Sequence, residues 1–446
     1  MISLHQIKGL EFELKEPSEG NYFVSAYPPF SCWQKEYVTE LKRELDAPPA
    51  AAGDRPFGLY VHIPFCVIRC MYCYYLSYAK KSPDDIDRYI AALIKELAMY
   101  HEKRNFENRH INFVYFGGGT PSILSVKQTH KLINTLKSLF PWTAVQEVTF
   151  ECAPKTVTES KLLTLREAGV TRISLGVQQL NDEVLEKNGR VHLVRDVERA
   201  YSMIQRIGFE MVNVDLMVGL IGESDVSFMD SLDQMIQMNP DSITIYQLEM
   251  PLNTPLFRNF RKGVLGDSLA NWDVKRARLA QGFARLEEAG YQLRSAYTAV
   301  RDSKRQQFVY QDAQYHGADL LGIGASAFSY VNETHYQNLT SLESYLQHID
   351  EGQLPIERAY VLSEEERLIR EFVLQLKLGK VNRTYFRRKF EVDIFERFHV
   401  PLAQFTSQGW LIRSDDELLL TREGLLRADR MLAAFYLPKH QDVRYS

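Results

Sequence analysis

The amino-acid sequence predicts an α/β fold built on a partial (β/α)6 TIM-like barrel, and three observations indicate it. From residue 57 onward, short apolar runs alternate with helical segments, a pattern typical of parallel α/β proteins. Each run ends in, or is followed by, a conspicuous polar or glycine-rich group. The chain has 446 residues, of which 45% are hydrophobic, so it can bury a sizeable core in two or three domains.

Six apolar runs are predicted to be strands. They are Phe57–Ile63, Ile111–Phe116, Glu147–Glu151, Arg172–Leu175, Met211–Leu216 and Ser242–Gln247. Periodicity alone does not separate a doubly wound sheet from a partial barrel built from these strands.

The polar groups favour the barrel because each of them lies at the carboxyl end of a strand. In an open sheet such groups would concentrate at one switch point, whereas a barrel gathers them around one mouth. In chain order they are a cysteine-rich loop, Gly117–Pro121, Glu151, Gln178, Asp215 and Tyr246–Gln247.

Helix signals fill the intervals between the strands. One helix is predicted to start after Ser82, with Pro83 at its first position and two aspartates in its first turn. Three further helices are expected. One runs from about residue 158 to 168, one ends at Gly208, and one runs from residue 269 to 289, and a glycine marks the end of each.

The ends of the chain read as separate regions. We expect an N-terminal extension over 1–54, the barrel over 55–300, a connecting segment over 301–357 and a C-terminal domain over 358–446. In the last region Ser363 and Glu366 form a capping box for a helix over Glu364–Leu378. A hairpin around Asp415–Asp416 and a helix after Thr421 should follow.

The extension contains an aromatic stretch over 21–33 and a proline- and alanine-rich linker over 46–54. Its Tyr-Pro-Pro-Phe sequence cannot continue a helix or a central strand, because proline has no N–H to donate. Two interpretations remain open: the aromatic side chains cover one end of the barrel, or they help to form a substrate pocket.

Composition excludes several classes of function. A net charge of −4 gives no electrostatic footprint for nucleic acid. No signal peptide and no apolar run of membrane-spanning length is evident. Only five cysteines occur, and three lie in one loop, so a disulfide scaffold is excluded and a cytoplasmic setting is expected.

That loop, directly after the first predicted strand, carries Cys66, Cys70 and Cys73. Three thiols at spacings of four and three residues can point at a common centre, and soft thiolates select zinc or iron–sulfur clusters. A structural zinc site with His62 or another residue as fourth ligand remains an alternative, although such sites usually have two C-x-x-C pairs and no second pair occurs here.

The C-x-x-x-C-x-x-C loop and the preceding Tyr60–Phe65 resemble the radical SAM superfamily. They are most similar to the branch of oxygen-independent coproporphyrinogen III dehydrogenase, haem chaperones and related methyltransferases. The resemblance implies a [4Fe-4S] cluster held by Cys66, Cys70 and Cys73, and S-adenosylmethionine that is cleaved to a 5′-deoxyadenosyl radical. It also implies a one-electron reductant such as flavodoxin or ferredoxin, and a small, mainly helical, winged-helix-like C-terminal domain.

The resemblance also assigns cofactor-binding positions, and in this branch it implies two molecules of S-adenosylmethionine. By that likeness Tyr60, Gly118 and Glu151 bind the first molecule, and Gln178, Arg190 and Asp215 bind the second. Gly119 and Thr120 fall between the two, and backbone near Ile323 lines the second. The alternatives are a structural ion pair at Glu151 and a buried Arg190–Asp215 pair.

Two departures decide among the activities of the branch. The dehydrogenase has a fourth cysteine where this chain has Tyr75, and the chaperones have a His-Asn-x-x-Tyr-Trp stretch that Gln307–Asp312 lacks. The leading hypothesis is therefore C-methylation or cyclopropanation of an sp² carbon of a small-molecule substrate, with the second S-adenosylmethionine as donor. A coproporphyrinogen-type oxidative decarboxylase and a haem chaperone are the alternatives.

Overall fold

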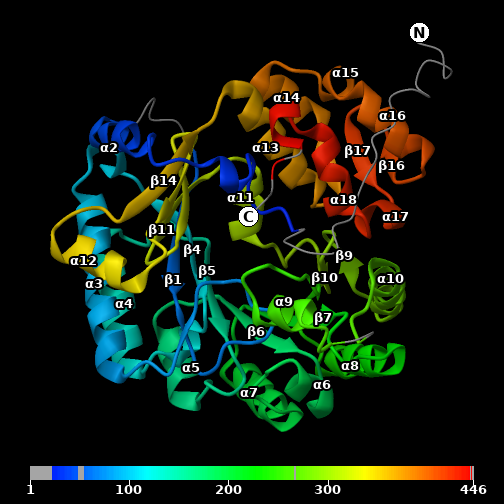
Figure 1. Cartoon of the computed structure of the whole chain (residues 1–446), viewed down its shortest axis with the longest axis horizontal. Helices are drawn as coiled ribbons and strands as arrows, with labels where there is room; N and C mark the ends of the chain where they lie inside the picture. Colours follow the sequence, from blue (N-terminus) through cyan, green and yellow to red (C-terminus); the bar gives the residue numbers. More distant parts are fainter. Residues whose placement is uncertain (1–22, 49–54, 266–267, 442, 444–446) are drawn as a thin grey trace.

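A computed structural model describes residues 23–48, 55–265, 268–441 and 443. Its centre is a twelve-stranded sheet in the order β14-β13-β12-β11-β1-β4-β5-β6-β7-β8-β10-β9 (Figure 1). All six predicted strands are present, and two have the predicted bounds. They are β1 (Phe57–Ile63), β4 (Ile111–Gly118), β5 (Glu147–Cys152), β6 (Arg172–Gln178), β7 (Met211–Val218) and β8 (Ser242–Gln247).

These six strands are parallel, and they form an open barrel rather than a closed one. Beyond β8 the sheet continues with the antiparallel strands β10 (Thr298–Val300) and β9 (Gln292–Leu293). On the other side β11 (Asp319–Ile323) pairs parallel with β1. Antiparallel strands then extend that edge: β12 (Phe328–Val331), β13 (Thr334–Asn338) and β14 (Ile356–Val361). The partial barrel is confirmed.

Helices cover the outer face of the sheet (Figure 1). The predicted capping residues begin them, since Ser82 and Asp85 form a capping box at α3 and Thr158 caps α5. The helices of this region are α3 (Pro83–His101), α4 (Val126–Leu139), α5 (Glu159–Glu167), α6 (Asp182–Lys187), α7 (Val194–Ile207), α8 (Asp225–Met238), α9 (Pro255–Arg261), α10 (Trp272–Glu288), α11 (Val309–Tyr315) and α12 (Leu342–Asp350).

Short elements complete the barrel region. Strands β2 (Phe65–Cys66) and β3 (Tyr78–Ala79) pair parallel at the two ends of the cysteine loop. Single 3-10 turns occur at Arg104–Phe106 and Pro121–Ile123.

The C-terminal domain is mainly helical, with a small sheet in the order β15-β17-β16. The predicted capping box opens α13 and the predicted hairpin forms, but the helix expected after Thr421 breaks into two because Arg427 leaves helical geometry at φ −124°. Its elements are α13 (Glu364–Leu376), β15 (Lys380–Asn382), α14 (Arg383–Phe390), α15 (Ile394–Arg397), α16 (His399–Ser407), β16 (Leu411–Arg413), β17 (Glu417–Leu420), α17 (Arg422–Leu425), α18 (Ala428–Leu432), a 3-10 turn (Ala433–Phe435) and α19 (Pro438–Gln441).

The described part of the N-terminal extension contains a 3-10 turn (Phe30–Cys32) and α2 (Val38–Asp46). Tyr27 is fully buried in the core of the C-terminal domain, and Trp33 stacks on His335 of β13. The extension therefore bridges barrel and C-terminal domain. Residues 49–54 of the predicted linker, and the start of the chain on which the signal-peptide prediction depends, lie outside the described residues. Among the described residues, no helix has the length and apolar character needed to cross a membrane.

Candidate functional site

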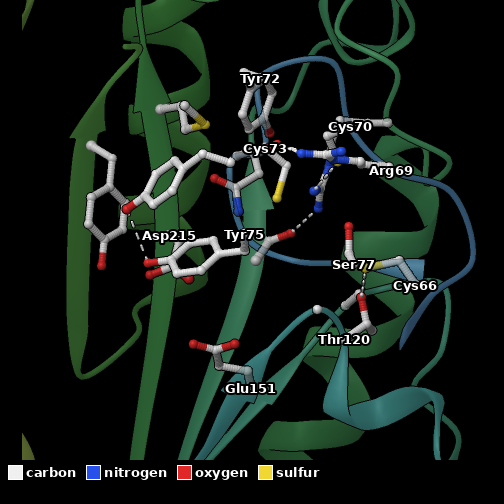
Figure 2. A pocket seen from close by; sticks show the side chains of 18 of the residues that line it. Cys66, Arg69, Cys70, Tyr72, Cys73, Tyr75, Ser77, Thr120, Glu151 and Asp215 are labelled. Atoms are coloured by element: carbon white, nitrogen blue, oxygen red, sulfur yellow. Dashed lines mark hydrogen bonds between the residues drawn. The ribbon is translucent and has the colours of Figure 1, made fainter. Parts of the chain in front are cut away.

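A cavity of about 350 Å³ opens at the carboxyl ends of the parallel strands. Most of the predicted site residues line it, although they come from segments spread between residues 66 and 215 (Figure 2). They are Cys66, Cys70, Cys73, Gly118, Gly119, Thr120, Glu151, Gln178, Arg190 and Asp215.

Two predicted residues do not line this cavity. Tyr60 lies in β1, where its hydroxyl is 3.1 Å from Nδ1 of His62 and its ring stacks 6.0 Å from that of Tyr115. Ile323 ends β11, and its side chain is fully buried in the main core. Cofactor contacts at these two positions stay predictions.

The cysteine loop presents its three thiols to the cavity. None of them is in a disulfide, and all are partly exposed. Two side chains from other elements donate hydrogen bonds to sulfur: Thr120 Oγ1 lies 3.4 Å from Cys66 Sγ, and Arg190 Nη1 lies 3.1 Å from Cys70 Sγ. The loop is thereby attached to the turn after β4 and to the segment after α6.

The glycine-rich turn after β4 packs directly against this loop. A Cβ atom on Gly119 would lie 2.8–2.9 Å from backbone atoms of Ile63 and Phe65, a distance too short for any side chain. Gly118 has φ +112°, and a Cβ atom there would meet the His62 ring at 2.5 Å. Only glycine permits this approach, which leaves backbone groups facing the cavity.

Glu151, at the end of β5, accepts hydrogen bonds from the Tyr115 hydroxyl at 2.7 Å and from the Gly118 amide at 3.2 Å. In the described structure it forms no ion pair, so the structural alternative for this residue is not observed. Burial raises its pKa to about 7, and the nearby charge of Asp215 adds to that rise. A carboxylate so placed is available to a hydroxyl or ammonium group of a ligand.

The second group of residues surrounds the end of β6. A bulge between Gly176 and Gln178 gives Gln178 φ +70°, an unusual backbone for a non-glycine residue that turns its side chain to the cavity. Arg190 donates to the Gly176 carbonyl at 2.9 Å, and its buried Nε has no partner among the described residues. Arg190 is one of the residues that line the cavity.

Asp215 is held by side chains of neighbouring strands rather than by Arg190. Asn213 Nδ2 and Ser174 Oγ donate to its two oxygens at 2.8 and 3.3 Å. Burial raises the pKa of Asp215 to about 6. The described structure shows no direct ion pair between Arg190 and Asp215, so the structural alternative for these two residues is not observed.

The profile of the radical SAM superfamily matches residues 60–235, and that of the HemN C-terminal domain matches residues 362–427. Heme chaperone HemW of Bacillus subtilis is 29% identical over 381 residues, covering 84% of this chain and 98% of its own length. HemW of Escherichia coli is 35% identical over 274 residues, and the match covers 61% of this chain and 69% of the relative. The chain belongs to the HemN-like branch of the radical SAM superfamily.

A solved structure of this branch extends the comparison to nearly the whole chain. Escherichia coli coproporphyrinogen III oxidase (HemN), described as a radical SAM enzyme, has a TM-score of 0.80 and 25% identity, covering 93% of this chain and 96% of its own. The oxygen-independent coproporphyrinogen III oxidase of Synechocystis is 25% identical over 448 residues, and the match covers 95% of this chain and 93% of the relative. The chain is thus a radical SAM enzyme with the HemN-like barrel and C-terminal domain.

Membership of the radical SAM superfamily implies a [4Fe-4S] cluster and S-adenosylmethionine, and the cysteine loop fits such a cluster. Among the described residues, no three His, Cys, Asp or Glu side chains converge closely enough for a single metal ion. A four-iron cube is wider than one ion and takes thiolates that stand farther apart. Burial raises the pKa of Cys73 to about 12, so cluster binding would release a proton there.

The radical SAM motifs did not predict the far wall of the cavity. Phe23 of the extension, Tyr297 beside β10 and Asp429 of α18 line it together with Tyr246 of β8 and Glu249 after that strand. Tyr246 was already among the polar groups predicted at the barrel mouth, whereas Glu249, two residues beyond Gln247, was not. Phe23 lies in the aromatic stretch over 21–33, for which a substrate pocket was one of two open interpretations, whereas Asp429 lies in a region with no chemical motif.

A buried carboxylate supports the turn after Ile323, and its pH dependence gives a first prediction. Glu96 of α3 accepts hydrogen bonds from the Gly324 amide at 2.8 Å and from Asn338 and Tyr345 at 2.6 Å. Burial raises its pKa from 4.5 to about 7. The stability contributed by this raised pKa is therefore fully present below pH 4.5 and is lost as the pH rises through about 7.

Between pH 4.5 and about 7, we expect the unfolding free energy of the wild type to fall by roughly 3 kcal/mol relative to that of Glu96→Gln. Thermal denaturation of both proteins at several pH values between 5 and 8 would measure this difference. Parallel pH profiles for the two proteins would contradict the prediction.

Proposed function

We propose that this radical SAM enzyme uses a second molecule of S-adenosylmethionine to methylate or cyclopropanate an sp² carbon of a planar acceptor. The observation that carries the proposal is the second polar group in the cavity, Gln178, Arg190 and Asp215, beside the cysteine loop and separate from Glu151. When bound, the cluster would supply the electron that cleaves the first S-adenosylmethionine.

The side chains of this chain then bind and orient the two cofactor molecules. Glu151, which the Gly118 amide and the Tyr115 hydroxyl hold in place, can accept from polar groups of the first. Arg190 combines a fixed position, through its bond to the Gly176 carbonyl, with an unpaired Nε that can donate to a carboxylate of the second. Asp215 can accept from a ribose hydroxyl or an ammonium group.

The walls of the cavity favour an acceptor other than a porphyrinogen, which carries four carboxylates. Arg69 donates to the Cys73 carbonyl of the cysteine loop, Lys155 pairs with Asp196 at 3.3 Å, and the Nε of Arg190 is assigned to the second cofactor. No other Lys or Arg lines the described cavity. The rest of the wall offers Glu249, Asp429 and aromatic rings, which repel a polyanion and suit a planar neutral or cationic group.

Tyr75 gives a second argument. It takes the position of the dehydrogenase's fourth cysteine, stacks on Tyr74 with ring centroids 4.5 Å apart, and projects into the cavity between the cysteine loop and Glu151 (Figure 2). At this place a tyrosine ring fills more of the space above the loop than a cysteine side chain would. The likeness to coproporphyrinogen III oxidase over nearly the whole chain still favours oxidative decarboxylation as the second candidate.

Anaerobically reconstituted enzyme with a reductant and methyl-deuterated S-adenosylmethionine separates the two candidates. With a small-molecule extract of the source cells as acceptor, we expect deoxyadenosine, S-adenosylhomocysteine and a product that carries deuterium. With coproporphyrinogen III we expect no loss of carboxyl groups. Decarboxylation of coproporphyrinogen III without S-adenosylhomocysteine would replace the proposal with the oxidase activity.

A further inference from the structure

A fully buried lysine joins three separate parts of the chain at the mouth of the cavity. Lys377, directly after α13, pairs with Asp429 of α18 at 3.1 Å, and neither side chain is more than 8% exposed. Its Nζ lies 3.5 Å from the centroid of the Phe23 ring and donates to the Val24 carbonyl. Removing a charge from water is costly, so such a lysine is retained only where several partners hold it.

The partners of Lys377 form the far wall of the cavity. The Phe23 ring lies 5.2 Å from that of Tyr297, which in turn stacks 6.5 Å from Tyr246. The Tyr297 hydroxyl donates to Asp429, and the Phe23 amide donates to Glu249 at 2.6 Å. Phe23, Tyr246, Tyr297 and Asp429 all line the cavity, whereas Lys377 stands behind them.

We infer that Lys377 is a positioning residue that fixes this aromatic wall, and that the wall binds a planar, neutral or cationic acceptor carrying an N–H or O–H group. The ring faces supply contact area for a flat molecule. Gln247 lines the same cavity, and its buried Oε1 has no hydrogen-bond donor among the described residues. Such an acceptor oxygen is costly to bury unless a ligand supplies the donor.

Without the Lys377 charge, Asp429 would be left buried with an unpaired carboxylate, and Phe23 would lose the cation that holds its ring. The wall would then lose its fixed spacing, while the cysteine loop and the residues around Glu151 would keep theirs. The inference rests on the proposed function only in placing the acceptor in this cavity. Its test therefore measures binding to the wall and not group transfer.

The test uses reconstituted full-length enzyme, without reductant, and fluorescence titration with two flat probes of opposite charge. Proflavine is a planar cation with N–H donors, and 8-anilinonaphthalene-1-sulfonate is an anion of similar size. We expect saturable proflavine binding, at least tenfold weaker in Lys377→Met, and S-adenosylmethionine binding unchanged. We also expect faster amide exchange at residues 23–33 of this variant. The double variant Lys377→Met/Asp429→Asn, which leaves no unpaired charge, covers the case that the single variant does not fold.

Lys389→Met is the matched control, because Lys389 pairs with the buried Glu371 at 2.7 Å in the same domain but does not line the cavity. It should bind proflavine as the wild type does. Wild-type proflavine affinity and amide protection in both Lys377 variants would overturn the positioning role. Equal or tighter binding of the anionic probe would overturn the acceptor class. Neither result depends on whether S-adenosylhomocysteine is formed. Failure of this inference can therefore be distinguished from failure of the proposed group transfer.

Discussion

Replacing Arg190 by alanine is expected to abolish group transfer while leaving the basal cleavage of S-adenosylmethionine largely intact. Arg190 contacts the cysteine loop, at 3.1 Å from Cys70 Sγ, and its Nε has no partner among the described residues. Loss of one pre-positioned donor typically costs about 10²–10³ in rate. We therefore expect S-adenosylhomocysteine formation to fall by at least that factor, and deoxyadenosine formation to fall only a few-fold.

The control for this prediction separates charge from geometry. Arg190→Lys keeps a positive charge near Cys70 but loses the planar fork that reaches Gly176 and the cavity together. It should retain iron and deoxyadenosine formation and recover little group transfer. Iron content must be measured in both variants, because Arg190 also contacts a thiol. Equal loss of deoxyadenosine and S-adenosylhomocysteine in a variant with full iron content would contradict the assignment of the second cofactor site.

The parts of the site that the sequence predicted are those fixed by local rules. Buried parallel strands read as apolar runs, so β1 and β8 have the predicted bounds. Side chains at the carboxyl ends of such strands meet at one mouth, so Glu151 and Asp215 could be placed in one cavity from their positions alone. The resemblance placed Gly118 and Gly119 at the cofactor site, and the close approach of Gly119 to backbone atoms of Ile63 and Phe65 supplies a physical reason for glycine there.

The parts that could not be predicted depend on contacts between distant segments. Strand β11 contains Gly322 and reads as a glycine-rich turn, but pairing with β1 across more than 250 residues makes it a strand. Phe23 reaches the cavity only because the extension packs on the C-terminal domain through Tyr27. An aspartate such as Asp429 is normally expected at the surface. Here it is buried because it forms an ion pair with the buried Lys377. Neither periodicity nor a motif carries that information.

Replacing Cys70 by alanine is expected to remove both the cluster and all reductant-dependent cleavage of S-adenosylmethionine. Cys70 lies between the other two thiols in the loop, and two ligands cannot hold a cube that needs three protein thiolates to leave one iron open. Iron and sulfide content, together with the visible absorption of the reconstituted protein, measure the loss. Deoxyadenosine formation should fall below detection, a larger effect than that of any other single substitution considered.

Cys32→Ala supplies the control, since Cys32 lies in the N-terminal extension and does not line the cavity. It should keep wild-type iron and activity, which excludes a general effect of losing a thiol. The same measurement decides between the two metals that a thiolate loop can select. Stoichiometric zinc in anaerobically purified wild type, or full activity of Cys70→Ala, would contradict the cluster. The proposed cleavage of S-adenosylmethionine would then lose the cluster that delivers its electron.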